Sequence, residues 1–424
     1  MLTLVATIAL IVGISCFLTL YAQGFFRRHH SYCLQRLPSP ADKGFTLTLA
    51  SLSDSFRTQG RITGFWLEAD AIFNARLTAI RQARRSIQFE TFIMTPGRRA
   101  SDFADALIEQ AQAGVSIQLV VDHYGTKSIP KTYWKRLQSA GVEVRFFNPF
   151  DWRSPFDYLD RTHRKLLLID QVKVLIGGAG VSDMWDGKEA SKDGMPWLDF
   201  EVCFEGETAA FLEGIFLQHW LDAGGVINLE GETFTALTNH DSDTLITSGE
   251  DPTLRDSSVR SLLQTLTYSA QTRLWLASPY LLPNDDFRKG LLQSKQNGVD
   301  VRLLTMSACT DKSYVYYAAR EMYRDLLEAG IQIFEYQPSM LHSKAILIDN
   351  SWVSFGSANF DSRSFFHNDE LNLSTKDAEL IQKVEQFFEL AFSRSQPITR
   401  RQWERRPLRH RILGQCSLLL RHQL

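Results

Sequence analysis

The sequence predicts an α/β protein made of two similar halves, and three observations support this. Segments with helical periodicity alternate with short β-branched runs, and glycines end most of the helices, as in α/β units. The same order of segments returns after roughly 180 residues, a period too long for a solenoid. Each copy then carries the same polar pattern. We therefore expect a duplicated α/β/α sandwich whose halves are related by a pseudo-twofold axis.

The secondary structure expected from periodicity repeats in order. In the first half we expect helices at 68–83, 102–113 and 130–140, and strands at 86–93, 115–121, 142–147 and 166–169. In the second half we expect helices at 259–270, 286–297 and 314–329, and strands at 273–277, 299–304, 331–334 and 345–348. The strands after Gly114 and Gly298 share one alternating pattern, and those after Gly141 and Gly330 share another.

With 424 residues the chain exceeds one compact domain. We expect five regions: a transmembrane anchor over 1–26, a linker over 27–65, a first half over 66–240, a second half over 241–395 and a basic tail over 396–424. The tail, from Arg394 on, carries eight arginines against the single acid Glu404. It suits an anionic membrane surface, and a solvated disordered end is the alternative.

The N-terminal segment predicts a membrane span. No charged residue lies between Leu2 and Ala22, and about 20 apolar residues cross the hydrocarbon core. A cleavable signal peptide is the alternative, but no Lys or Arg precedes Leu2 as its basic region would require. The basic residues Arg27 and Arg28, with His29 and His30, follow the span. The positive-inside rule then places the body of a single-pass protein on the cytoplasmic side.

Composition excludes several classes of protein. The net charge of -2 lacks the overall basic signature of nucleic-acid binding. The five cysteines show neither CxxC spacing nor an even count, which argues against a zinc site and a disulfide framework and favours a reducing compartment. We expect no metal, no cofactor and no nucleic-acid partner.

The pattern H-x-K-x-x-x-x-D occurs once in each half, and an apolar run and a glycine turn follow each copy. Its positions are His163, Lys165 and Asp170 in the first half, and His342, Lys344 and Asp349 in the second. A single H-x-K is nearly uninformative. Two copies at equivalent points of a duplication indicate one shared site.

Strand geometry separates the roles within each pattern. Side chains alternate between faces, so a histidine and a lysine two residues apart share a face. The aspartate lies seven residues after the histidine, on the opposite face and about 23 Å along a regular strand. We therefore expect Asp170 and Asp349 to hold the strand end and the glycine turn.

Each histidine needs another carboxylate to set its tautomer and orientation. The candidates lie on the next strand of each half: Asp199 follows His163 by 36 residues, and Glu370 follows His342 by 28. Glu201, on the same face as Asp199, is an alternative in the first half. Solvated charges at strand ends are the plain structural interpretation of these acids.

Two other interpretations of the histidines compete with catalysis. Each could be a core histidine bonded to backbone, but two histidines and two lysines recur together. Each could bind zinc, but a lysine on the same face repels a dication. A lysine beside a histidine suits an anion instead.

These motifs resemble those of the phospholipase D superfamily, over a range from about Glu68 to Phe392. Within it the chain is similar to bacterial cardiolipin synthases, in the apolar N-terminus and in the segments 197–206, 356–364, 368–370 and 403–407. The resemblance implies that all six motif residues are catalytic and that Asn359 helps to bind phosphate. Gly180 departs from the family pattern, which has asparagine there, so a phosphate donor is missing on that side.

The resemblance also implies a mechanism. Lys165 and Lys344 neutralise the phosphate oxygens without a metal. One histidine attacks phosphorus, and the other protonates the leaving alkoxide and then deprotonates the incoming hydroxyl. The resemblance favours His163 as nucleophile, although the near-symmetry of the halves leaves His342 open.

The implied function is phosphatidyl transfer at the bacterial inner membrane: cardiolipin synthesis from two phosphatidylglycerol molecules with release of glycerol. The implied partners are an anionic phospholipid membrane and a lipid substrate. The alternatives are a phosphodiesterase that hydrolyses phospholipid or nucleic acid on the same site, and a catalytically inactive, membrane-tethered binding protein. The four intact His and Lys positions argue against the inactive protein.

Overall fold

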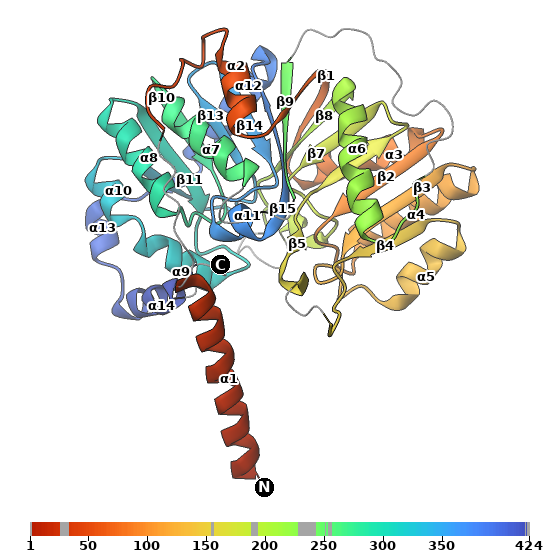
Figure 1. Ribbon diagram of the computed structural model, residues 1–424, viewed down its shortest axis with the longest axis horizontal. Coiled ribbons are helices and arrows are strands. Elements are labelled where there is room, and N and C mark those ends of the chain that lie inside the picture. The colour runs from red at the N-terminus through yellow and green to blue at the C-terminus, as the bar shows by residue number, and fades with distance from the viewer. Residues whose placement is uncertain are drawn as a thin grey trace.

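The computed structural model describes residues 2–25, 34–153, 157–187, 194–227, 243–250, 252, 257–419 and 421. Its strands join into one mixed sheet with helices on both faces, as Figure 1 shows. The predicted α/β class and the two similar halves are confirmed.

The strand order is the same when read inward from either end of the sheet. The first half runs inward as β4 (Glu143–Phe147), β3 (Ser116–Asp122), β2 (Ser86–Thr91), β6 (Leu166–Ile169), β7 (Lys173–Gly177), β8 (Phe200–Gly206) and β1 (Phe56–Leu67). The second half runs inward from the edge strand β16 (Ser395–Pro397) as β12 (Gln332–Tyr336), β11 (Asp300–Met306), β10 (Arg273–Ala277), β13 (Ala345–Ile348), β14 (Trp352–Gly356), β15 (Asn368–Thr375) and β9 (Asp243–Gly249).

The antiparallel pair β1–β9 joins the halves at the centre, so the pseudo-twofold axis passes between these strands. The prediction of a linker over 27–65 is therefore wrong for its last part. It also contains helix α2 (Phe45–Leu52). The backbone of β1 pairs with β8 on one side and β9 on the other. Backbone pairing with its two neighbours defines this strand, and its sequence has no regular apolar alternation. Hydrophobic periodicity therefore did not predict it.

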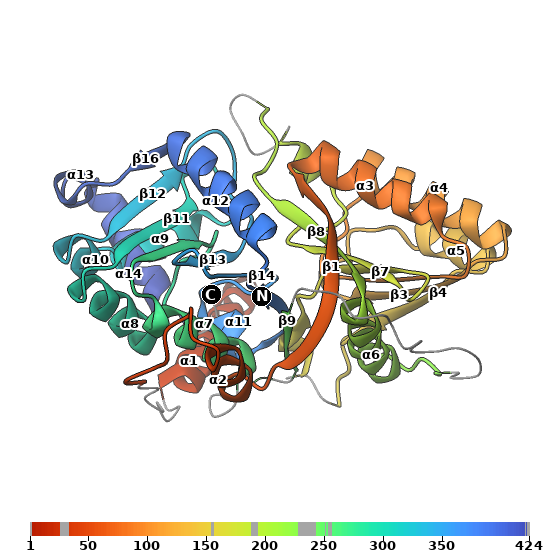
Figure 2. The same cartoon turned by 90° about the horizontal axis from the view of Figure 1, so that it is seen from above.

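Helices cover both faces of each half (Figure 2). In the first half they are α3 (Ala69–Gln82), α4 (Arg98–Gln112), α5 (Lys131–Ser139) and α6 (Glu207–Asp222). In the second half they are α7 (Ser258–Ser269), α8 (Asp285–Gln296), α9 (Ser313–Glu321), α10 (Arg324–Glu328), α11 (Ser362–Phe366) and α12 (Ala378–Ser393). The single helix predicted over 314–329 is thus split into α9 and α10, with the buried side chains of Met322 and Tyr323 at the break.

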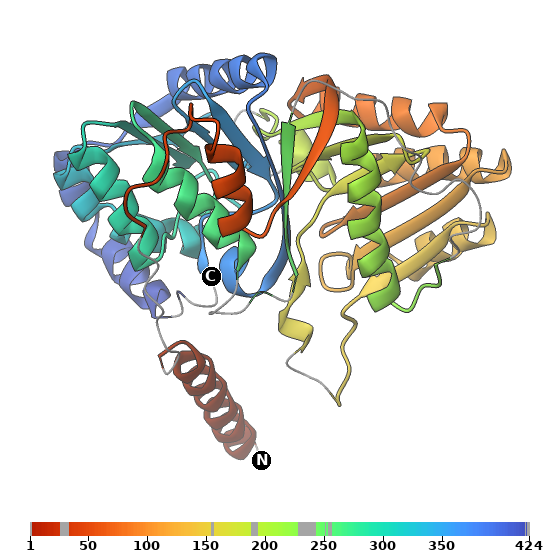
Figure 3. The same cartoon turned by 45° about the horizontal axis from the view of Figure 1, so that its top comes forward.

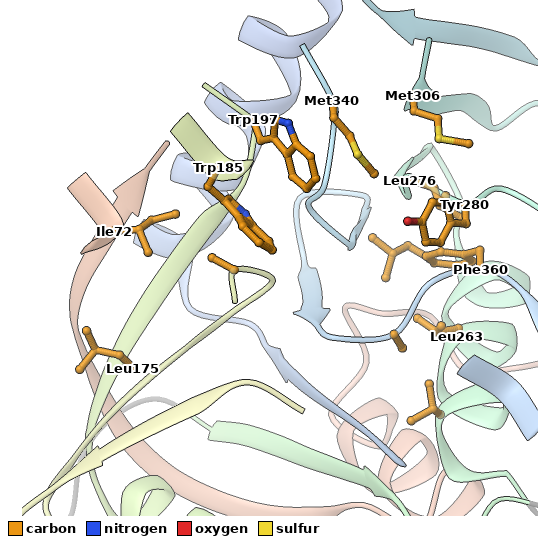
Figure 4. Packing of buried hydrophobic residues seen from close by; sticks show 14 of the residues in the cluster. Ile72, Leu175, Trp185, Trp197, Leu263, Leu276, Tyr280, Met306, Met340 and Phe360 are labelled. Atoms are coloured by element: carbon orange, nitrogen blue, oxygen red, sulfur yellow. The ribbon is translucent and has the colours of Figure 1, made fainter. Parts of the chain in front are cut away.

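The apolar core continues from one half into the other. Figure 4 shows Trp185 and Trp197 of the first half close to Met340 of the second. The backbone agrees, because the N–H of Leu198 donates to the carbonyl of Met340 at 2.9 Å. The halves therefore share a packed interface.

The segment predicted as the anchor forms helix α1 (Leu2–Phe25), which extends away from the two halves (Figures 1 and 3). Within the described residues, no helix is both long enough and apolar enough for a membrane crossing. The predicted basic flank, from Arg27 to His30, lies outside the described residues.

The described part of the basic tail is folded, so the alternative of a disordered end is wrong there. It forms α13 (Arg400–Glu404) and α14 (Leu408–Leu418), and α14 packs on α9. Arg406 is buried and forms an ion pair with Glu321 at 2.9 Å. Arg409 and Arg411 remain exposed.

Candidate active site

Each histidine–lysine segment is attached to the opposite half. In the first half it follows the short strand β5 (Arg161–Thr162), which pairs in parallel with β15 of the second half. The N–H of His163 donates to the carbonyl of Asp369 at 2.8 Å, and the N–H of His342 donates to that of Leu198 at 2.8 Å. Both segments lie just before β6 and β13, the strands predicted at 166–169 and 345–348.

This attachment crosses the histidine–carboxylate pairs. His163 Nδ1 lies 3.0 Å from each carboxylate oxygen of Glu370, and His342 Nδ1 lies 2.9 Å from Asp199 Oδ2. Asp199 and Glu370 were predicted as the orienting acids of their own halves. The residues are thus the predicted ones, but the pairing is wrong, because each acid follows the segment to which the other half's histidine is attached.

Glu201, the alternative acid, does not reach a histidine. Its carboxylate pairs with the guanidinium of Arg76, with 2.8 Å between Nε and Oε1, and both side chains are buried. Arg76 also donates to the carbonyls of Ala179 and Gly180. Glu201 therefore holds the first glycine turn through Arg76.

The carboxylates fix the histidine tautomers. An ionised carboxylate only accepts hydrogen bonds, so each Nδ1 carries the proton and each Nε2 keeps its lone pair. Burial lowers the pKa of His163 to about 4, and burial with the nearby Lys344 lowers that of His342 to about 4. Burial opposes ionisation of Glu370, but the His163 imidazole and Lys165 outweigh it and hold its pKa at about 2. Both imidazoles are neutral in the free site.

Both lysines are buried beside their histidines. Lys165 donates to the carbonyl of His163, and Lys344 Nζ lies 3.2 Å from His342 Nε2. Burial lowers the pKa of Lys165 to about 7 and that of Lys344 to about 8, because the charged form loses hydration. Nearby carboxylates oppose this at both lysines, and repulsion from Lys344 lowers the pKa of Lys165 further. An arriving phosphate would restore the charged forms.

Asp170 and Asp349 point away from the histidines, as strand alternation predicted. The catalytic role that the resemblance implies for them stays a prediction. Asp170 accepts backbone N–H bonds from Arg84, Arg85 and Ser86 at the start of β2. Asp349 does the same for the residues that begin β10. They hold these strand starts rather than the glycine turns. Both have positive φ, 54° and 50°, which aspartate tolerates better than most residues.

The two glycine turns differ as the sequence indicated. Asn359 lines the site, and its Oδ1 is buried without a hydrogen-bond partner among the described residues. A Cβ at Gly180 would lie 2.3 Å from Ile93 Cγ2 and 2.6 Å from the Ile93 carbonyl. No asparagine fits there, so the departure from the family pattern reflects packing.

One cavity of about 580 Å³ lies between the halves and is lined by His163, Lys165 and His342. Its aromatic lining was not predicted. The Trp185 ring meets the His342 ring edge-on at 5.0 Å, the Trp197 ring stacks on it at 5.8 Å, and Phe92 packs against His163 at 5.4 Å. These side chains exclude water around the imidazoles. In sequence they look like ordinary core residues.

The donor set suits an anion. Within the described part of the chain, no group of three or more His, Cys, Asp or Glu side chains is arranged to hold a metal ion. Lys165 and Lys344 lie beside the histidines, and Lys127, Arg161, Lys312 and Arg363 also line the cavity.

Comparison with known proteins agrees with this geometry. The family model described as "Cardiolipin synthase, PLD-like domain" matches residues 77–184 and 262–391. The chain is 32% identical to cardiolipin synthase 2 of Bacillus anthracis over 405 residues, which cover 94% of this chain and 76% of the relative. This chain belongs to the cardiolipin synthase family of phospholipase D-like enzymes.

One further relative supports the family, and one solved structure supports the fold. Cardiolipin synthase A of Pseudomonas syringae is 31% identical over 339 residues, covering 78% of this chain and 69% of the relative. The crystal structure of phosphatidylserine synthase from Haemophilus influenzae has a TM-score of 0.69 at 12% identity, and the match covers 89% of this chain and 99% of that one. At this identity the structural match supports the duplicated fold alone.

Proposed function

We propose that this enzyme transfers phosphatidyl groups through a phosphohistidine and makes cardiolipin from two phosphatidylglycerol molecules, releasing glycerol. The observation that carries the proposal is the convergence of both motif histidines on one cavity, each with Nδ1 held by a carboxylate and a buried lysine beside it. A nucleophile and a separate proton donor must act on one phosphate together.

In the first step, Nε2 of His163 attacks phosphorus, the P–O bond to the headgroup glycerol breaks, and protonated His342 gives its proton to the leaving oxygen. In the second step, His342 takes the proton from a hydroxyl of a second phosphatidylglycerol. That oxygen attacks phosphorus, the N–P bond breaks, and His163 is neutral again. Lys165, Lys344 and Asn359 stabilise the charge on the phosphate oxygens.

The substrate itself supplies the required protonation state. In the free site both imidazoles have pKa values of about 4, so both are neutral. A bound phosphodiester places a negative charge beside them, which favours a protonated imidazole. Binding therefore charges the proton donor only when there is a phosphate to attack.

We also propose that α1 attaches the enzyme to the membrane that holds its substrate. Support comes from the absence of charged residues in α1 and from its exposed apolar side chains, among them Val5, Leu10 and Ile11. The exposed Arg409 and Arg411 of α14 suit an anionic surface. Washing membranes with high salt and then with carbonate, before and after deletion of 1–26, tests the attachment. Salt release of the full chain would contradict an inserted anchor.

The experiment that tests the function uses the full chain and vesicles of phosphatidylglycerol. We expect cardiolipin and free glycerol in equal amounts, and neither product with His163→Ala. Phosphatidic acid as the only lipid product would replace the transferase with a hydrolase on the same site. A phosphorylated His163 in acid-labile form, trapped after a rapid quench, would support the covalent intermediate.

A further inference from the structure

The cavity that receives an anionic phosphate also contains two carboxylates, Asp311 and Asp361. Their charges act on Lys344, so they lie on the second-half side of the site. Carboxylates repel phosphate but accept hydrogen bonds from hydroxyl groups. Asp311 and Asp361 would therefore bind a part of the ligand other than its phosphate.

Two segments of the second half form this side of the cavity, which we call the wall. Leu281 and Phe360 form a parallel bridge, which brings Tyr280 alongside Asn359 and Asp361. Figure 4 shows the Tyr280 ring beside Phe360, with its hydroxyl turned toward the side where the first-half tryptophans lie. That hydroxyl, on a side chain 9% exposed, donates to Asp311 and lies 2.8 Å from both carboxylate oxygens. The Asp311 carboxylate is therefore held in a defined orientation, with lone pairs remaining.

The charges of this wall are balanced. Lys312 Nζ lies 4.7 Å from the centre of the Tyr280 ring, and Lys312 and Arg363 both act on Asp361. Two carboxylates thus face two cations. A wall with little net charge but many hydrogen-bonding atoms favours a neutral group rich in hydroxyls over a phosphate or an ammonium group.

A second, independent feature points to a ligand at this wall. Asn359 is 3% exposed and lines the same cavity, and its Oδ1 has no hydrogen-bond partner among the described residues. A buried amide oxygen without a partner costs about 1–3 kcal/mol. A ligand hydroxyl would satisfy it while Nδ2 remains available to the phosphate.

We propose that Asp311, Asp361, Tyr280 and Asn359 form a polyol subsite that binds the glycerol headgroup of the lipid substrate through its free hydroxyls. The inference rests on the proposed function, and in it these four residues select the headgroup of the substrate. It also places the leaving and entering oxygens on the side of Lys344, next to His342.

The test measures headgroup release from vesicles of phosphatidylcholine that contain either phosphatidylglycerol or phosphatidylpropanol, which lacks the free hydroxyls. We expect the wild type to prefer phosphatidylglycerol by about tenfold or more in kcat/KM, since lost hydrogen bonds to a polar site are costly. Asp311→Asn should reduce this preference about fivefold, and Tyr280→Phe should reduce it less. Asp285→Asn, on the exposed first turn of α8, is the matched control and should leave the preference unchanged.

Each outcome decides the proposal. Equal rates on the two lipids in the wild type, or an unchanged preference in Asp311→Asn, would overturn the polyol subsite even if cardiolipin is made. Higher rates on phosphatidylethanolamine than on phosphatidylglycerol would assign the wall to an amine instead. Preference for phosphatidylglycerol with phosphatidic acid as the only product would keep the subsite and reject the transferase. Lack of turnover on all three lipids would overturn both.

Discussion

The two glycine turns, residues 177–180 and 356–359, lie at equivalent points of the halves but are held by different groups. In the first half the buried guanidinium of Arg76 donates to the carbonyl of Gly180 at 2.9 Å. In the second half the side chain of Asn372 accepts a hydrogen bond from the turn backbone at 3.3 Å. In the first turn, Arg76 and Ile93 pack against Gly180 and leave no room for a side chain. In the second turn, the Asn359 amide lines the cavity.

The orienting acids differ in the same way. Asp199 accepts a hydrogen bond from the indole N–H of Trp185 at 3.1 Å, whereas Glu370 accepts one from the hydroxyl of Ser357. Gly178 takes the place of that serine in the first half, where a Cβ would lie 2.6 Å from the Asp199 carboxylate. The duplication thus keeps the reacting groups and changes what supports them. Such halves can carry different roles in one reaction, and the following predictions test that difference.

The largest expected effect is loss of either histidine. His163→Ala and His342→Ala should each lower cardiolipin formation by at least about 10⁴-fold with an unchanged melting temperature, because nucleophile and acid act as a unit. His410→Ala, on α14, is the control. Substantial activity in either site variant at normal stability would remove the two-histidine mechanism.

A lipid with a p-nitrophenol leaving group sharpens this comparison, because such a group leaves without a proton donor. His342→Ala should then release one equivalent of p-nitrophenol in a burst, and His163→Ala should release none. The reverse result would exchange the roles of the two halves.

Next in size is loss of the crossed orienting acids. Glu370→Gln and Asp199→Asn should each lower kcat by about 10³- to 10⁴-fold, since an amide can favour the wrong tautomer. Nitrogen NMR should show an altered tautomer at His163 only for Glu370→Gln, and at His342 only for Asp199→Asn. An effect on the histidine of the same half would contradict the crossed pairing.

The lysines predict an alkaline limb in the pH profile. In the free site Lys165 and Lys344 lose their protons as the pH rises through about 7 and about 8, so kcat/KM should fall above these values. A bound phosphate favours the charged lysines, so the fall in kcat should come at higher pH. Lys165→Arg should move the first part of the limb upward. A kcat/KM that rises between pH 8 and about 10 would reject this assignment.

A smaller effect is expected for the two aspartates that end the motifs. Asp170→Asn and Asp349→Asn should each cost about 1–3 kcal/mol of stability, because charged acceptors of backbone N–H bonds are weakened. Asparagine tolerates positive φ, so the substitution leaves the backbone conformation unchallenged. The folded fraction should keep its specific activity. A normal melting temperature with a large loss of activity would assign these residues to catalysis after all.

The smallest expected effect is that of chelation. Lysines supply the positive charge at the site, so EDTA should leave the initial rate within experimental error. Dialysis against EDTA, followed by assay with and without added Mg²⁺ or Zn²⁺, checks this. Recovery of a lost rate by either ion would show that a metal takes part.

Local sequence determined the repeated order of helices and strands, including the bounds of β6, β10 and β13, because periodicity is a property of neighbouring residues. It also indicated that the histidine and lysine of each motif lie side by side and that Asp170 and Asp349 point elsewhere. Both follow from the two-residue period of extended chain.

The tertiary structure alone decided which groups meet across the halves. Alternation along a strand assigns a face but no partner, so it could not show that Glu370 serves His163 and Asp199 serves His342. It also could not separate Asp199 from Glu201, because both lie on the same face of the strand. Only the structure shows that Glu201 is paired with Arg76. The strand β1, defined by backbone pairing, was hidden for the same reason. Contacts between residues far apart in sequence depend on how the duplicated sheet joins at its centre, which local pattern does not encode.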